Sequence, residues 1–135
     1  MAAATNYTEL NVLNYMLTTT ALTGTNARPT AWYVALFTAA PSDSGGGTEC
    51  TGGSYARQSV AFTVAQASGV TTGTNTATIT FPVASANWGT VTHLAVMDAL
   101  TSGNMLFHGA LTASKAIDTG DTFQITAGNL SIELQ

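Results

Sequence analysis

The chain has 135 residues, enough to bury roughly two thirds of the surface that its unfolded form exposes, and we expect a single domain over residues 1–135. Charged residues make up 7% of the sequence, against about 25% in an ordinary soluble domain, and the formal net charge is −4. Arg28, Arg57 and Lys115 are the only cationic residues and lie far apart, which excludes a basic patch for nucleic acid. Polar residues also interrupt every apolar run too early for a membrane-spanning helix.

The N-terminal segment, residues 1–24, predicts one short helix. Asn6 and Glu9 have the spacing of a capping box, in which each side chain binds a backbone amide at the start of a helix. Apolar residues then recur at helical spacing, at Tyr7, Leu10, Leu13, Met16 and Leu17. This stripe needs a partner, which is either one face of the sheet or an equivalent helix of another subunit.

The remainder of the chain, residues 31–135, predicts a series of short strands. Both faces of residues 31–39 are apolar, as in a buried central strand. Residues 41–54 are rich in glycine and predict an exposed loop, and we expect its single cysteine, Cys50, to be an exposed thiol without an evident role. The alternation over residues 55–64 predicts a half-buried strand.

A loop rich in glycine and threonine is expected to follow through Asn75. Residues 76–81 then predict an edge strand, which Pro82 ends because proline has no amide to donate. Near the C-terminus, a turn at residues 118–121 precedes two last alternating strands around Phe123 and Ile132. Short strands between turns, with one N-terminal helix, predict a mainly β fold, namely an antiparallel β-sandwich or a jelly-roll-like barrel.

Residues 88–111 predict a hairpin, with two apolar runs around a turn-rich centre. Pairing Met97 with Asn104 across that turn places His93 opposite His108 on one face. The other face is the better candidate for the core and carries Leu94, Val96, Met105 and Phe107. Because the histidine face is also largely apolar, we expect cover on both sides, from a second sheet or a neighbouring subunit.

Two opposed imidazoles are close enough to share a metal, but His93 and His108 lack the further ligands that a zinc site requires. We therefore expect histidines that bind the backbone or lie in a subunit contact, where an effect of pH on assembly remains an open alternative. A triad of Ser102, His93 and Asp98 lacks a nucleophile elbow. The glycine runs lack the lysine of a phosphate loop, and Asp118 and Asp121 fit an ordinary turn.

No catalytic, cofactor-binding or metal-binding residue is therefore expected, and we do not expect an enzyme. Four aromatic residues offer a sugar-stacking platform as an alternative to core packing: Trp32, Tyr33, Tyr55 and Trp88. Core packing is the commoner fate of aromatics on alternating strands, so we favour it, and Trp88 is the residue to test for exposure.

Several blocks of the sequence, in this order and spacing, resemble a family of short tailed-bacteriophage proteins commonly described as tail-fibre proteins. The similarity runs from about Ala31 to the C-terminus, and its blocks include WYVALF at 32–37, GGSYARQ at 52–58, FP at 81–82 and WGTVTH at 88–93. The resemblance implies a structural component of the virion, which fits the low charge and the uncharged, threonine-rich and glycine-rich composition.

The small size, without a long shaft or repeats, favours a head decoration or cement protein that binds the capsid surface through many weak contacts. The alternative is a short tail fibre or appendage protein that contacts a receptor or glycan. We expect other virion proteins as partners, either the major capsid protein or tail proteins, and a homo-oligomer, with no nucleic acid, membrane or cofactor. The candidate assembly contact is formed by Tyr7, Leu10, Leu13 and Leu17.

Overall fold

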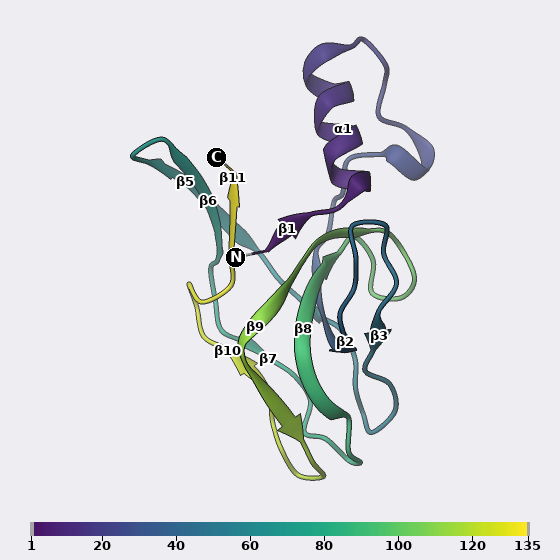
Figure 1. The fold of residues 1–135 in the computed structure, drawn as a ribbon, viewed down its shortest axis with the longest axis vertical. Helices are drawn as coiled ribbons and strands as arrows, with labels where there is room; N and C mark the ends of the chain where they lie inside the picture. The colour runs from purple at the N-terminus through teal and green to yellow at the C-terminus, as the bar shows by residue number, and fades with distance from the viewer. Residues whose placement is uncertain (1, 135) are drawn as a thin grey trace.

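The structure, a computed structural model, describes residues 2–134 and is mainly β, with one α-helix in that range (Figure 1). The helix α1 (Asn6–Leu17) and a short 3-10 helix η1 (Gly24–Asn26) follow the first strand. The strands are β1 (Ala3–Ala4), β2 (Tyr33–Ala39), β3 (Thr48–Glu49), β4 (Gln58–Ser59), β5 (Phe62–Ala67), β6 (Val70–Asn75), β7 (Ile79–Thr80), β8 (Gly89–Met97), β9 (Met105–Ile117), β10 (Gln124–Ile125) and β11 (Ser131–Leu134). They pair antiparallel in three sheets, none closed into a barrel, so the mainly β prediction is confirmed.

The largest sheet has the order β1-β9-β8-β2-β3, and β4 also pairs with β2. As predicted, β2 is a central strand, and Val34, Ala35 and Leu36 are fully buried in it. Both faces of this strand are apolar because each face of the sheet carries its own cluster. The main core lies on one side, and a smaller cluster of Ala35, Phe37, Ala95 and Met97 lies on the other.

Aromatic rings fill the centre of the main core. Phe81 lies in edge-to-face contact with Phe123, with ring centroids 5.7 Å apart, and Tyr55 meets Trp88 in the same way at 5.3 Å. Trp88 is only 5% exposed, and its indole Nε1 donates a hydrogen bond to the Gly53 carbonyl oxygen at 2.9 Å. Core packing is thus confirmed for Trp88, so a sugar platform built on this residue is wrong.

Cys50 corrects the sequence prediction, because its thiol is buried and not exposed. Its backbone amide donates to the Leu36 carbonyl oxygen at 2.9 Å, which holds the chain after β3 against β2 and brings the thiol into the main core. Burial raises the pKa of Cys50 to about 11. A buried thiol with this pKa is an inert packing group.

The predicted hairpin forms as β8 and β9, but its register differs from the expectation. Ala95 lies opposite His108, and His93 lies opposite Ala110. Two shifts of one residue each cause the difference: Met97 pairs with Met105 and not with Asn104, and the irregularity between Val96 and Met97 places one extra residue, Leu106, on the β9 side. The two histidines are therefore diagonal neighbours and not a directly opposed pair.

The strand predicted over residues 55–64 is only partly correct, since it is broken between β4 and β5, and the loop predicted through Asn75 is wrong. The chain instead forms the short β4 and then a hairpin of β5 and β6, to which β11 adds a third strand. A two-residue turn joins β5 to β6, with φ values of 52° at Ser68 and 82° at Gly69. Positive φ at both positions matches the twist of paired strands, so the turn supports a hairpin.

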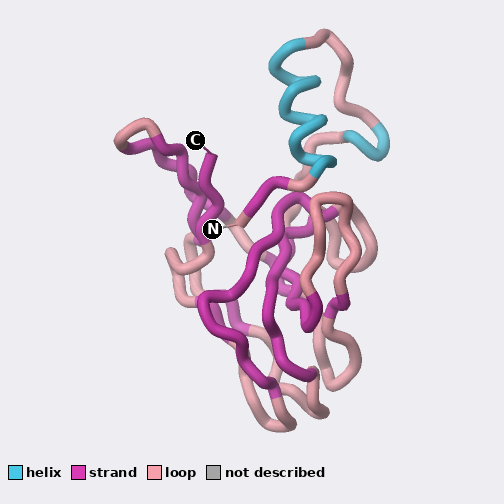
Figure 2. Tube along the Cα trace, in the orientation of Figure 1, coloured by secondary structure: helices cyan, strands magenta, loops and turns pink. Residues whose placement is uncertain are grey.

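Two arms project from the large sheet in the same direction (Figures 1 and 2). One arm is α1 with the loop that follows it, and the other is the three-stranded sheet of β5, β6 and β11, which we call the wing. The N-terminal strand β1 runs between them and pairs with β9. The space between the arms contains the surface described next.

Candidate assembly surface

The helix α1 is attached to the sheet through its first turn. Thr5 is its N-cap, because this residue is extended (φ −88°, ψ 163°) and its hydroxyl oxygen accepts from the Thr8 amide at 3.4 Å. The Thr5 hydroxyl also donates to the Met105 carbonyl oxygen at 2.6 Å, and the Thr8 hydroxyl donates to that of Leu106 at 2.7 Å. The capping box predicted from Asn6 is wrong, since Asn6 is already part of the helix.

The predicted contact residues of α1 fall into two groups. Tyr7 faces the body and packs against the main core. The other three point away from it, with exposed fractions of 57% for Leu10, 57% for Leu13 and 75% for Leu17. No side chain of α1 is fully buried, so the helix contributes little to the core.

The usual arrangement of a surface helix is reversed in α1. Its partly buried positions include the polar residues Thr8, Asn11 and Asn14, whereas its leucines lie in solvent together with Met16, which is 68% exposed. A surface helix of a monomeric protein normally presents its apolar stripe to the core. The outer face of α1 is therefore an exposed apolar surface, a feature common at the interaction sites of proteins.

Two adjoining cavities lie between the arms. One, of about 860 Å³, lies between α1 and the segment that follows it, and the other, of about 420 Å³, lies against the wing. They share Arg28, Trp32 and Phe107, and the second is also lined by Val64 and Ile132. We call the two together the apolar depression. It gives the molecule a concave surface beside its exposed helix.

Charge is sparse on both surfaces. Glu9 is the one charged residue of α1, and Arg28 is the one charged residue that lines the apolar depression, among the residues that the structure describes. Both side chains are exposed. Other side chains make the charged contacts found within residues 2–134: Arg57 forms an ion pair with Glu49, and the His108 imidazole is hydrogen-bonded to the Asp43 carboxylate.

The two histidines have separate partners. The imidazole Nδ1 of His93 lies 2.8 Å from the Thr92 hydroxyl, and Nε2 of His108 lies 2.9 Å from the Asp43 carboxylate. Over residues 2–134, no three His, Cys, Asp or Glu side chains gather in a way that could hold a metal ion. Each histidine therefore makes a local hydrogen bond, and the bond from His108 links β9 to the loop after β2.

The remaining polar candidates serve turns. Both carboxylate oxygens of Asp98 accept hydrogen bonds from Asn104, at 2.7 Å from its backbone amide and 2.8 Å from its side chain. The Asp121 carboxylate accepts from the Asp118 amide at 2.9 Å, which confirms the ordinary turn predicted there. The Asp98 carboxylate thus closes the turn between β8 and β9.

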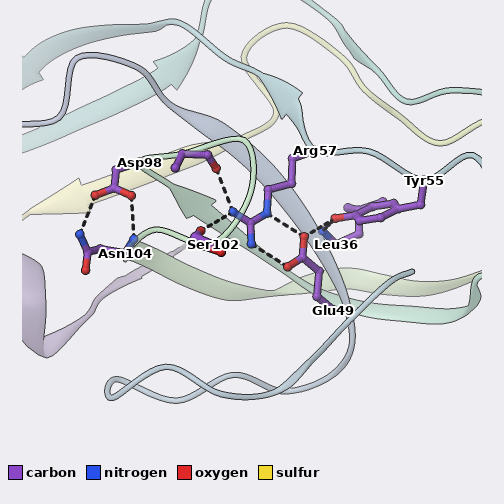
Figure 3. Close-up of polar contacts among 8 residues, drawn as sticks. Leu36, Glu49, Tyr55, Arg57, Asp98, Ser102 and Asn104 are labelled. Atoms are coloured by element: carbon purple, nitrogen blue, oxygen red, sulfur yellow. Dashed lines mark hydrogen bonds and ion pairs between the residues drawn. The ribbon is translucent and has the colours of Figure 1, made fainter. Parts of the chain in front are cut away.

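Sequence reasoning missed a polar cluster that joins three distant segments (Figure 3). The Arg57 guanidinium donates two hydrogen bonds of 2.8 Å to the Glu49 carboxylate, in a bidentate pair. It also donates to the carbonyl oxygens of Ala99 and Ser102, at 2.8 and 2.7 Å. Arg57 therefore holds β3 against the β8–β9 turn. The available signal was a pair of opposite charges eight residues apart in a nearly uncharged chain.

Tyr55 completes this cluster. Its hydroxyl donates to Glu49 at 2.9 Å and accepts from the Leu36 amide at 3.0 Å. Burial raises the pKa of Tyr55, which keeps this donor protonated. Burial also opposes ionisation of Glu49, but the hydrogen bonds from Arg57 and Tyr55 outweigh it, so the pKa of Glu49 lies below its ordinary value. The hydrogen bond to Glu49 raises the pKa of Arg57.

The similarity of this chain to known proteins identifies its family. No helix within residues 2–134 is long and apolar enough to cross a membrane. No curated protein matches the chain. A family model described as podophage GP4 fiber I protein gp80 matches residues 3–133, nearly the whole sequence. The chain therefore belongs to this Gp80 family of podophage fibre proteins and is a component of the virion.

Proposed function

We propose that this chain is a non-enzymatic structural component of the tail fibre of a short-tailed phage, and that it binds neighbouring tail proteins through the exposed face of α1. The observation that carries the proposal is the family match over residues 3–133, because the matched family is described by a fibre protein. Head decoration, favoured above from size alone, receives no support from this match, and the tail-fibre alternative fits better.

The exposed apolar face of α1 supports a role in assembly. Leu10, Leu13 and Leu17 are each more than half exposed on a helix that projects beyond the sheet. Burying such side chains against a partner is favourable, by about 1.5–3 kcal/mol for each fully exposed leucine. A partner tail protein that covers this face would gain affinity without any charged contact.

The engagement of polar groups in the fold supports a structural role over a catalytic one. Asp98 closes a turn, His93 binds Thr92, and Arg57 and Glu49 bind each other. These side chains stabilise loops and strand ends. Chemistry would require such groups to be available to a substrate.

Electron microscopy of virions labelled with a gold-conjugated antibody to this chain tests the proposal. We expect gold at the tail. Gold spread over the head would contradict the tail-fibre assignment and restore head decoration. Virions that lack the gene product provide the control for labelling specificity.

A further inference from the structure

The exposed helix face and the apolar depression are two unpartnered apolar surfaces of opposite shape on one chain. One is convex and contains Leu10, Leu13 and Leu17, with Glu9 as its charged residue. The other is concave and contains Trp32, Phe107, Val64 and Ile132, with Arg28 as its charged residue. The convex surface of one copy of the chain would therefore cover the concave surface of another copy.

We propose that the exposed face of α1 of one copy docks into the apolar depression of a second copy, with Glu9 of the first beside Arg28 of the second. This inference rests on the proposed structural function and names a partner for its assembly surface. The two charges have opposite signs, and each is the single charge on a surface that is otherwise uncharged. Electrostatic complementarity of this kind sets register more than affinity.

The geometry of α1 agrees with this contact. The helix has 12 residues, which corresponds to about 18 Å, and its attachment through the first turn leaves the leucines beyond that turn free to enter a partner. Glu9 and Leu13 lie four residues apart, so they share one side of the helix. The face that enters the partner therefore carries the carboxylate at its base and the leucines toward its tip.

A second copy fits this surface better than an unrelated chain because both halves of the contact are present in one sequence. A helix-into-depression contact uses different patches on the two copies, so it closes into a ring, continues as an open filament, or is made twice in a two-fold dimer. In each arrangement no copy inside the assembly leaves its leucines or its Trp32 and Phe107 surface in water.

Charge reversal tests the contact, with self-association measured by sedimentation velocity over a dilution series. Glu9→Arg and Arg28→Glu each place like charges together, and we expect each to weaken self-association about tenfold or more. An equimolar mixture of the two variants restores opposite charges between copies, and we expect it to associate nearly as tightly as the wild type. Both positions are exposed, so folding should be unchanged, which circular dichroism would verify.

Two matched variants control for the change in net charge. Asp118→Arg changes the charge by the same amount as Glu9→Arg, and Lys115→Glu matches Arg28→Glu, at exposed positions on β9 and its following turn. We expect both to associate like the wild type. Reversals that weaken association no more than these controls would overturn the proposal, as would a mixture that associates no better than its components.

A wild-type chain that sediments as a monomer throughout the series would also overturn the proposal, and would leave a different tail protein as the occupant of the apolar depression. Failure of this contact is distinguishable from failure of the tail-fibre assignment, because gold labelling of virions reports the position of the chain whatever its self-association.

Discussion

The cluster around Arg57 makes a quantitative prediction about stability. Arg57→Met keeps most of the apolar stem but removes four hydrogen bonds, two to Glu49 and two to carbonyl oxygens of the β8–β9 turn. Breaking a buried ion pair by removing one partner costs about 3–5 kcal/mol. The Arg57 side chain is 9% exposed, but that of Glu49 is 25% exposed, so water compensates part of the loss. We expect a loss of about 2–3 kcal/mol.

Chemical denaturation followed by circular dichroism measures this loss in the free energy of unfolding, and thermal denaturation measures the corresponding fall in melting temperature. For a chain of 135 residues, about 1 kcal/mol corresponds to roughly 3–4 °C in melting temperature, so Tm should fall by roughly 7–10 °C. Arg28→Met is the matched control, since Arg28 is exposed and its loss should change the stability of the dilute protein by less than about 0.5 kcal/mol. A loss below about 1 kcal/mol for Arg57→Met would refute the view that this cluster holds the turn.

Three further predictions follow from the same structure. Because the folded state lowers the pKa of Glu49, the ionised carboxylate stabilises the fold fully above the ordinary pKa of a glutamate, and this stabilisation is lost as pH falls through the pKa of the folded state. Glu49→Gln should therefore flatten the acid limb of the stability profile measured by denaturation, and an unchanged limb would contradict this. Gly53→Ala should destabilise the fold by about 2–4 kcal/mol in the same assay, since φ is +52° and a Cβ would lie 2.6 Å from a backbone carbonyl oxygen. Gly52→Ala is the control, because its φ is also positive (+69°) but the space around it is open, so it should cost only about 1 kcal/mol. Equal costs would rule out the close approach of the backbone to Gly53. Leu13→Asp should leave the melting temperature of the dilute protein nearly unchanged while weakening self-association about tenfold, whereas loss of the fold would place this helix in the core.

Local patterns in the sequence predict several elements correctly. The doubly apolar run that became β2 indicates burial on both faces, and the structure confirms it. The two apolar runs around residues 98–103 predict the β8–β9 hairpin, and the helical spacing after Asn6 predicts α1. These successes share one cause, since periodicities of 2.0 and 3.6 residues report backbone conformation within a single segment.

The wing shows the limit of such patterns. Gly73 and Asn75 make residues 70–75 resemble a loop, yet these residues form β6 because β5 and β11 pair with it on both sides. Pairing with two neighbours overrides the weak strand propensity of glycine. The Ser-Gly dipeptide at residues 68–69 was the sequence signal for the turn between β5 and β6.

By itself, the sequence determined that this chain is mainly β, that α1 forms, and that charge is too sparse to build a basic surface. Tertiary structure decided the register of His93 and His108, through the pairing of Met97 with Met105 and an irregularity at Val96, neither of which a local pattern encodes. It also decided that α1 turns its leucines outward and that Arg57 meets Glu49. The physical reason is that apolar periodicity indicates which side chains of a segment favour burial, whereas the segments against which they pack are brought together only by folding.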